Sequence, residues 1–406
     1  MDLLQLGADT ATARSARHFD APPRRATRCE ELEAQVERLL ERMHIAIIYG
    51  SEKAVGGAGD NRPIDLRSCT SDRAVAEDID DALTRIGARR VCVIPDDRHL
   101  GDRLRDEGVH MAWLNTGGVQ GYHATCRSAA MLEMLGIPYV GHDPLTAATL
   151  DNKLTFKRVL SNLGIATPRS VTWDLARGPF WREVNDHYLQ VFGDYEGSFV
   201  VKPVTGHSSA HARLVDDADD LTEAVAVVCH AAKSPVLIES YLPGREFCVA
   251  VCGAVTARHG QLVRRDEPFV LAAFERTRGA DQTIAAVMGV PPITVERLRA
   301  LNPDGDAVEL AELQQLARIV FHEMALDSIV RLDLRADAAG RMAVLAVDPE
   351  LDLIAPTKDT TSLVGAGLAD HGMTYDDLIL SLLADRVDIL LSQGRSAATR
   401  LTALLD

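Results

Sequence analysis

The feature that most constrains how this chain can fold is a pair of apolar segments near its C-terminal end. Residues 330–334 and 344–347 each show the pattern of a β-strand. Ala338-Ala339-Gly340 between them is typical of a hairpin turn. The two segments are therefore predicted to lie side by side as neighbouring strands of one sheet.

Three carboxylates lie on this predicted strand pair, Asp333 on the first strand and Asp348 and Glu350 on the second. Because strand side chains alternate, Asp348 and Glu350 point to the same face. Carboxylates gathered at one spot repel each other unless a cation lies among them, and Mg²⁺ prefers hard oxygen ligands. The pattern favours a magnesium site. The alternative is a solvated acidic sheet face on a chain of formal net charge -16.

A second informative segment is the short apolar strand at 198–203, which carries Lys202 near its end. A small polar loop, residues 204–210, follows it. The chain has six lysines against thirty-seven arginines, so Lys202 is not routine surface filler. An ammonium beside a hydroxyl-rich loop is suited to binding phosphate, because backbone N–H and hydroxyl groups can cradle its oxygens. The alternative is an exposed lysine beside an ordinary turn.

A third segment, residues 234–253, reads as a strand, a Pro-Gly turn and a second strand. The order of these segments resembles the ATP-grasp superfamily and, within it, the D-alanine–D-alanine ligase family, over residues 44–390. The motifs that carry the resemblance are residues 135–141, 151–154, 201–203, 237–242, 244–247 and 331–333.

The resemblance implies an α/β fold, α+β in part, in which two α+β units sandwich ATP behind an N-terminal Rossmann-like parallel sheet. The expected divisions are an arm and helix at 1–43, the Rossmann-like domain at 44–150, a central subdomain at 151–235 and a C-terminal metal-binding domain at 236–406. Alternating strands and helices between 44 and 141 also favour a parallel sheet. Residues 262–307, rich in proline, are expected to form a loop-rich lid.

The resemblance also assigns roles to individual residues. Lys153 and Lys202 would hold the ATP phosphates, and Ser208 and Ser209 would belong to the loop that closes over the γ-phosphate. Arg331 would hold the substrate carboxylate and the developing oxyanion. The remaining implied residues are Glu239, Tyr241 and Leu242 at the adenine, Glu246 at the ribose, Asp333, Asp348 and Glu350 at two magnesium ions, and Glu52 and Ser362 at the substrate. Without the resemblance, Lys153 reads as an exposed helix cation and Arg331 as a structural ion-pair partner.

Some segments depart from the family pattern. Relatives have Glu-x-Asn where this chain has Asp348-x-Glu350, which keeps the oxygen ligands but adds a negative charge. The Gly-Glu-Asp-Gly segment is missing near 117–121, and the turn at 351–362 is about three residues longer than in relatives. The ATP machinery therefore looks retained, and the substrate pocket remodelled.

These observations predict an ATP- and Mg²⁺-dependent ligase that joins a carboxylate to an amine through an acylphosphate. The remodelled pocket favours amino-acid-like substrates of specialised metabolism, with D-alanine a poor substrate. The alternatives are a D-alanine–D-alanine ligase of cell-wall synthesis and a catalytically silent ATP-binding regulatory protein. A net charge of -16 argues against nucleic acid as the main partner. No apolar run is long enough to span a membrane, and seven scattered cysteines suit free thiols in the cytoplasm. A homodimer is expected.

Overall fold

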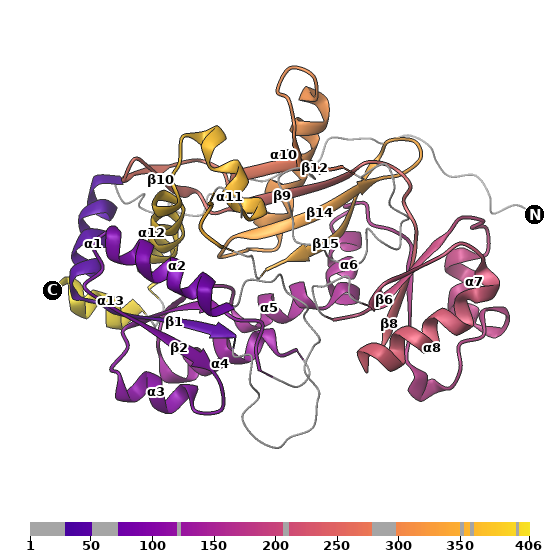
Figure 1. The fold of residues 1–406 in the computed structure, drawn as a ribbon, viewed down its shortest axis with the longest axis horizontal. Coiled ribbons are helices and arrows are strands. Elements are labelled where there is room, and N and C mark those ends of the chain that lie inside the picture. The colour runs from indigo at the N-terminus through magenta and orange to yellow at the C-terminus, as the bar shows by residue number, and fades with distance from the viewer. Residues whose placement is uncertain are drawn as a thin grey trace, which may run out of the picture.

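The structure is a computed structural model (Figure 1), and it describes residues 29–50, 72–119, 123–205, 211–277, 298–349, 353–357, 361–394 and 398–406. The N-terminal arm at 1–28 lies outside the described residues. So do four of the predicted site residues: Glu52, Ser208, Ser209 and Glu350.

The N-terminal unit is built on a parallel sheet of order β2-β1-β3-β4, which confirms the parallel α/β expectation. Its strands are β1 (His44–Gly50), β2 (Arg90–Asp96), β3 (Met111–Asn115) and β4 (Tyr139–Val140). Its helices are α1 (Cys29–Arg42), α2 (Asp72–Arg85), α3 (Leu100–Asp106), α4 (Thr125–Leu135) and α5 (Pro144–Asp151). Ile45 and Ile47 join a core with α1 and α2, whereas Ala46 and Ile48 join another with α3 and α4. Both faces of β1 are covered, which explains its continuous apolar sequence.

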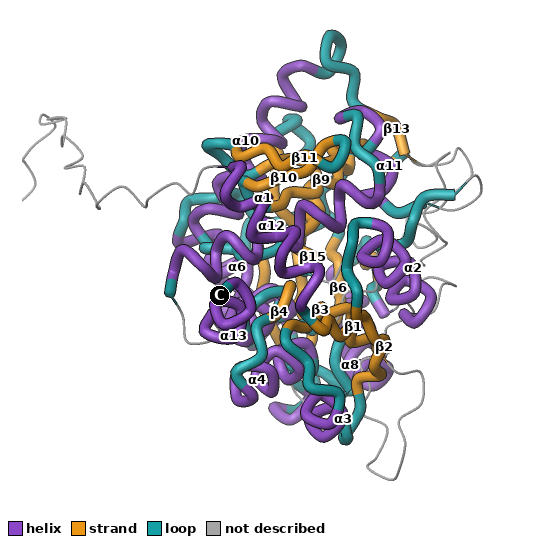
Figure 2. Tube along the Cα trace, turned by 90° about the vertical axis from the view of Figure 1, so that its left-hand side faces the viewer, coloured by secondary structure: helices purple, strands orange, loops and turns teal. Residues whose placement is uncertain are grey.

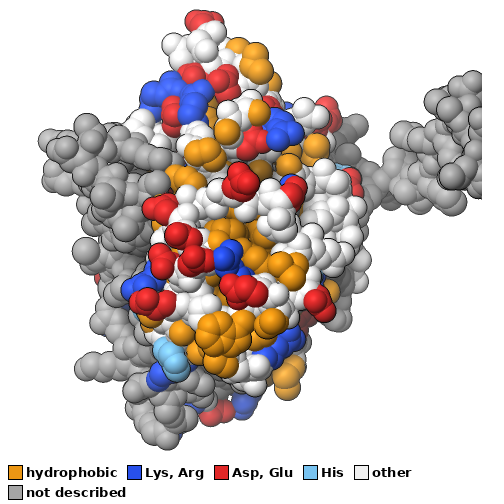
Figure 3. All heavy atoms as spheres, turned by 90° about the vertical axis from the view of Figure 1, so that its right-hand side faces the viewer, with side chains coloured by type: hydrophobic (Ala, Val, Ile, Leu, Met, Phe, Trp, Pro, Cys, Tyr) orange, Lys and Arg blue, Asp and Glu red, His pale blue; other side chains and the backbone are white. Residues whose placement is uncertain are grey.

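The central unit has an antiparallel sheet of order β5-β8-β6-β7 (Figure 1, right). Its strands are β5 (Ser170–Trp173), β6 (Phe199–Pro203), β7 (Arg213–Val215) and β8 (Val236–Ser240). Helix α6 (Lys153–Asn162) leads into it, and α7 (Asp186–Phe192) and α8 (Leu221–Ala232) pack on the sheet. Acidic, basic and hydrophobic side chains are interspersed on the molecular face viewed from this end (Figure 3).

The third unit carries a five-stranded sheet of order β13-β12-β9-β14-β15. Its strands are β9 (Glu246–Cys252), β12 (Phe269–Arg276), β13 (Leu298–Ala300), β14 (Val330–Ala336) and β15 (Met342–Asp348). The predicted hairpin at 330–347 is confirmed, because β14 pairs antiparallel with β15. Helix α10 (Ala307–Glu323) packs on the face that contains Phe247 and Val249. The expected loop-rich lid is wrong for 269–276, since this segment is an inner strand of the sheet. Pro268 lies just before the strand begins, where it leaves the ladder intact.

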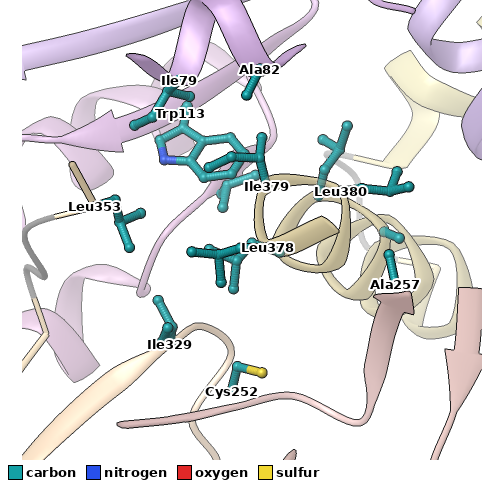
Figure 4. Close-up of a cluster of buried hydrophobic side chains, with 14 of the residues drawn as sticks. Ile79, Ala82, Trp113, Cys252, Ala257, Ile329, Leu353, Leu378, Ile379 and Leu380 are labelled. Atoms are coloured by element: carbon teal, nitrogen blue, oxygen red, sulfur yellow. The ribbon is translucent and has the colours of Figure 1, made fainter. Parts of the chain in front are cut away.

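Helix α12 (Tyr375–Gln393) crosses between the parallel sheet and the C-terminal sheet (Figure 2), beside the hairpin of β10 (Val255–Arg258) and β11 (Gln261–Arg264). Leu378 and Ile379 belong to the hydrophobic cluster that also includes Trp113 of β3 (Figure 4). Short helix α11 (Leu363–Gly367) precedes α12, and α13 (Ala398–Leu405) packs against α1.

The polar side of α12 is covered by backbone. Three of its side chains, four residues apart, accept hydrogen bonds from backbone N–H groups of β10 and the adjoining turn. The pairs are Asp377 with Gly260 at 2.8 Å, Ser381 with Ala257 at 2.7 Å, and Asp385 with Val255 at 3.0 Å. The helix thus satisfies donors that a neighbouring strand would otherwise pair. Among the described residues, no helix is long and apolar enough to cross a membrane.

Candidate nucleotide and metal site

The register of the C-terminal sheet gathers charged side chains on one face. Arg331, Asp333 and Arg335 alternate along β14, so they point to the same side. Neighbouring strands bring charged residues opposite to them: Asp348 of β15 faces Arg331, and Glu246 of β9 faces Arg335. Since the other face is apolar and packs on α10, the charged face is the candidate functional face.

Asp333 and Asp348 converge on a single cation, the Arg331 guanidinium. Arg331 Nε donates to Asp333 Oδ1 at 3.0 Å, and Arg331 Nη2 lies 3.2 Å from Asp348 Oδ2. Burial alone would raise the pKa of the Asp333 carboxyl, but Arg331 and Arg276 outweigh burial and hold this pKa below its ordinary value. The Asp333 carboxylate is therefore suited to remain ionised.

The donor set fits magnesium, because two carboxylates from neighbouring strands reach one cation and carboxylate oxygen is a ligand that Mg²⁺ prefers. The third predicted ligand, Glu350, falls outside the described residues. Within the described part of the chain, no group of three or more His, Cys, Asp or Glu side chains is placed to hold a metal. Arg331 forms ion pairs with both carboxylates, which is the structural role given above as the alternative for this residue.

Across from this face, two lysines hold the buried carboxylate of Glu239. Lys157 Nζ lies 2.8 Å from Glu239 Oε1, and Lys202 Nζ lies 2.7 Å from Glu239 Oε2. The Lys157 and Glu239 side chains are each 3% exposed. Burial lowers the pKa of Lys157 to about 8, against the opposing effect of Glu239. Burial would raise the pKa of Glu239, but the two lysines lower it.

Local structure explains how these lysines meet. Lys153 begins α6, and its backbone N–H donates to Val204 O at 2.9 Å, just beyond the strand that carries Lys202. Lys157 lies one helical turn further on the same face of α6. Burial and the charge of Lys202 lower the pKa of Lys153 to about 8. Sequence analysis missed Lys157, although its spacing of four residues from Lys153 in a lysine-poor chain was the available signal.

The lysines and the carboxylates belong to one site. The charge of Asp348 acts to raise the pKa of Lys153, and the charge of Lys202 acts to lower the pKa of Asp333. Both effects require proximity between these side chains, and helix α6 contacts strand β15. The structure thus brings Lys153, Lys202, Asp333 and Asp348 near one another, and their roles stay a prediction.

The segment between β8 and β9 connects the central and C-terminal sheets and carries Tyr241 and Leu242. Tyr241 N–H donates to Ser198 O at 2.9 Å, which ties the segment to the start of β6. Gly244 N–H donates to Ala336 O at 3.0 Å, and an added Cβ at Gly244 would lie 2.5 Å from that oxygen. Only glycine permits this close approach to the end of β14.

Glu246, expected at the ribose, is held by two arginines on neighbouring strands. Arg276 Nη1 of β12 donates to Glu246 Oε1 at 3.1 Å, and Arg335 Nη2 of β14 donates to Glu246 Oε2 at 2.6 Å. Arg335 also lies over the Tyr241 ring, with its guanidinium carbon 5.2 Å from the ring centroid. Neither arginine was singled out from the sequence, because their pairing depends on strand register.

The predicted substrate residue Ser362 is buried, and its hydroxyl caps α11 by accepting from Gly365 N–H at 3.0 Å. A pocket, whose lining does not include Ser362, opens at the carboxyl ends of β3 and β4, with Pro349, the residue after Asp348, in its wall. The described residues that line it are Trp113, Leu114, Asn115, Thr116, Val140, Gly141, Ser328, Ile329, Pro349, Leu353 and Leu382, all uncharged. This is the edge at which sheets of parallel strands commonly bind ligands.

Comparisons with known proteins agree with this geometry. The family model described as "D-ala D-ala ligase C-terminus" matches residues 159–384, more than half of the chain. A D-alanine–D-alanine ligase of Pseudomonas putida (strain GB-1) is 28% identical over 84% of this chain and 93% of the relative. Another, of Synechococcus sp. (strain JA-3-3Ab), is 25% identical over 79% of this chain and 88% of the relative.

Solved structures show the same fold. The D-alanine–D-alanine ligase of Bacillus anthracis complexed with ATP has a TM-score of 0.58 at 16% identity, over 87% of this chain and 99% of that one. The D-alanyl-alanine synthetase A of Vibrio cholerae has a TM-score of 0.58 at 18% identity, over 85% and 98%. The expected ATP-grasp fold and ligase class are confirmed, and the expected cofactors, ATP and Mg²⁺, are those of this family. The family model, which matches more than half of the chain, shows that this chain belongs to the D-alanine–D-alanine ligase family of ATP-dependent ligases that form carbon–nitrogen bonds.

Proposed function

We propose that this protein is a D-alanine–D-alanine ligase, which activates one amino acid with ATP and joins it to the amine of a second. The observation that carries the proposal is the placement of Lys153 and Lys202 close to Asp348 and Asp333, where α6 contacts β15. The names of the relatives favour D-alanine as substrate. The preference for specialised metabolism drawn from the sequence gains no support from these relatives.

In this proposal the cationic residues bind phosphate and substrate carboxylate, and the acidic residues bind Mg²⁺. Lys153 and Lys202 bind the phosphates of ATP, with Ser208 and Ser209 in the loop that closes over them. Asp333, Asp348 and Glu350 would hold Mg²⁺, which would neutralise phosphate charge during transfer. Arg331, whose planar fork suits a carboxylate, holds the substrate carboxylate and the oxyanion. Tyr241 and Leu242 lie at the adenine, while Glu52 and Ser362 contact the amino acids.

In this assignment Glu239 positions the lysines, and its expected contact with adenine is secondary. Its two carboxylate oxygens lie within 3 Å of Lys157 and Lys202, so it fixes the Lys202 ammonium at the end of β6. Catalysis is then mainly positioning together with charge neutralisation.

The direct test is ADP release by the full chain with ATP and Mg²⁺ against a panel of D- and L-amino acids. We expect D-alanine to give the highest turnover and a dipeptide product. Lys202→Ala should abolish most of this activity, and Lys233→Ala, which removes an exposed lysine at the end of α8, should retain it. If no amino acid stimulates ADP release, the ligase assignment is wrong and the silent nucleotide-binding alternative stands.

A second substrate assignment, amino-acid-like substrates of specialised metabolism, is favoured by one feature. The pocket beside Pro349 is lined by Asn115 and Thr116, directly before the region 117–121 from which the family's Gly-Glu-Asp-Gly segment is missing. A pocket whose polar groups do not match a substrate discriminates against it strongly, by roughly 10⁴–10⁵ in good cases. If another amino acid exceeds D-alanine in the same panel, this second assignment replaces the first.

We also propose a cytoplasmic homodimer. Met134 of α4 and Leu145 of α5 are 88% and 77% exposed on two helices that contact each other, which favours a partner on that side. Light scattering of the purified protein should give twice the mass of 44.1 kDa. A monomer at micromolar concentration would contradict the dimer.

A further inference from the structure

Arg335 is buried in a position where one of its donors has no acceptor. The residue is 8% exposed, and Nη2 is used by Glu246. Its Nε is buried without a hydrogen-bond partner. Because a buried donor without an acceptor costs free energy and is uncommon, such a group requires an explanation.

The surroundings of Arg335 point to a ligand at this place. Its guanidinium lies over Tyr241, which belongs to the segment proposed for the adenine, and it shares Glu246, proposed for the ribose, with Arg276. Arg335 is two residues from Asp333 on the same face of β14, a separation of about 7 Å along the strand. One nucleotide can therefore span the magnesium ligand and Arg335.

We propose that Arg335 is a specificity-determining residue that donates to the ribose hydroxyl oxygens of the nucleotide, with Glu246 accepting from the same hydroxyls. This inference rests on the proposed function, since it requires that the nucleotide bind in this cleft. The chemistry is complementary: a hydroxyl both donates and accepts, and the pair offers one carboxylate and one guanidinium. The ligand class is therefore a ribonucleotide with both hydroxyls free.

The test is calorimetric titration of the full chain, in the presence of Mg²⁺, with ATP, 2′-deoxy-ATP and 3′-deoxy-ATP. For the natural protein we expect one or both deoxynucleotides to bind more weakly than ATP. Arg335→Met should weaken ATP about tenfold, as expected for the loss of a hydrogen bond to a charged group. The affinity for the deoxynucleotide that lacks the contacted hydroxyl should fall much less, so the ratio of the two affinities should be smaller in the variant than in the natural protein.

A kinetic readout separates ribose recognition from a general structural role. The KM for ATP should rise in Arg335→Met, whereas kcat and the KM for the amino acid should change little, because Arg335 lies away from the transferred phosphate. Arg335→Lys retains the charge beside Glu246 but not the fork of donors, and it should show the same loss of discrimination. This second variant keeps the test valid if Arg335→Met does not fold.

Arg264→Met is the matched control. Arg264 of β11 also pairs with a carboxylate, Asp388, and also has a buried Nε without a partner, but it lies against α12. It should leave nucleotide affinity and discrimination unchanged. Equal weakening of all three nucleotides in both Arg335 variants, or no change, would overturn the inference while leaving the proposed function intact. If the natural protein binds none of them, the proposed function itself fails.

Discussion

The titration of Asp385 leads to a testable prediction. Asp385 is buried on the side of α12 that packs against β10. Its Oδ1 accepts from Val255 N–H at 3.0 Å, and the carboxylate lies against Gly253, where an added Cβ would lie 1.9 Å from Oδ2. Burial is the largest effect on this group and raises the pKa of Asp385 to about 7, helped by the charges of Asp388 and Asp327 and opposed by the Val255 hydrogen bond. The substitution Asp385→Asn keeps an oxygen acceptor and removes the titration.

The sign of the effect follows from the raised pKa. The folded protein binds a proton on Asp385 more tightly than the unfolded chain does, so this stabilising contribution is complete below pH 3.8 and is lost as pH rises through about 7. Each pKa unit corresponds to roughly 1.4 kcal/mol, so the difference between 3.8 and about 7 amounts to about 4 kcal/mol. Because asparagine does not titrate, the Asp385→Asn variant should not lose this stability as pH rises.

Urea denaturation at pH 4, 5, 6, 7 and 8 measures the contribution. The free energy of unfolding of Asp385→Asn, minus that of the natural protein, should rise by up to about 4 kcal/mol from pH 4 to pH 8. Asp377→Asn is the matched control on the same face of α12. Burial would raise the pKa of Asp377, but hydrogen bonds from Gly260 and Thr374 lower it. The stability of Asp377→Asn relative to the natural protein should therefore be lowest above pH 4, the opposite trend to that of Asp385→Asn. Identical pH profiles for Asp385→Asn and the natural protein would refute the reasoning.

The remaining predictions concern the candidate site. Glu239→Gln leaves Lys157 buried without its anion, and the free energy of unfolding at pH 7 should fall by about 3–5 kcal/mol in urea denaturation. Because loss of the Glu239 charge lowers the pKa of Lys157 below its value of about 8 in the natural protein, the deficit should narrow as pH rises towards 8 and the variant's lysine becomes neutral; a deficit that grows instead would contradict the pairing. Asp348→Ala should lose most ATP turnover, on the order of 10–100-fold, whereas Glu350→Asn should keep measurable turnover because asparagine still offers an oxygen. Full activity in Asp348→Ala would place the metal elsewhere.

Much of the architecture could be predicted because it depends on short-range pattern. Alternating strands and helices were expected between 44 and 141, and β1 and β3 lie in this stretch as strands of one parallel sheet. The carboxylates of Asp333 and Asp348 could be placed near each other because a hairpin fixes which residues face one another. The family resemblance supplied the order of the units, which the pattern alone does not determine.

Other features depend on contacts between distant segments. Helix α12 continues to Gln393, although Asp385 and Asp388 interrupt its apolar pattern. Asp385 accepts a backbone N–H, Asp388 pairs with Arg264, and Arg386 donates to Tyr139 O at 2.8 Å. Polar residues on a helix are therefore not always exposed to solvent, because backbone groups of a neighbouring strand can cover them.

The same limit governs the site itself. Alternation along β14 shows that Asp333 and Arg335 share a face, but it does not show which residue of another strand lies opposite. The partner of Arg335 follows from the register of β9, which pairs it with Glu246, and β12 brings Arg276 to the other side of that carboxylate. A shift of one residue in either pairing would send these arginines to the apolar face that packs on α10. Because burial of three charges there would be costly, the hydrophobic alternation of the strands fixes the register and, through it, the arrangement of charges around the proposed ribose site.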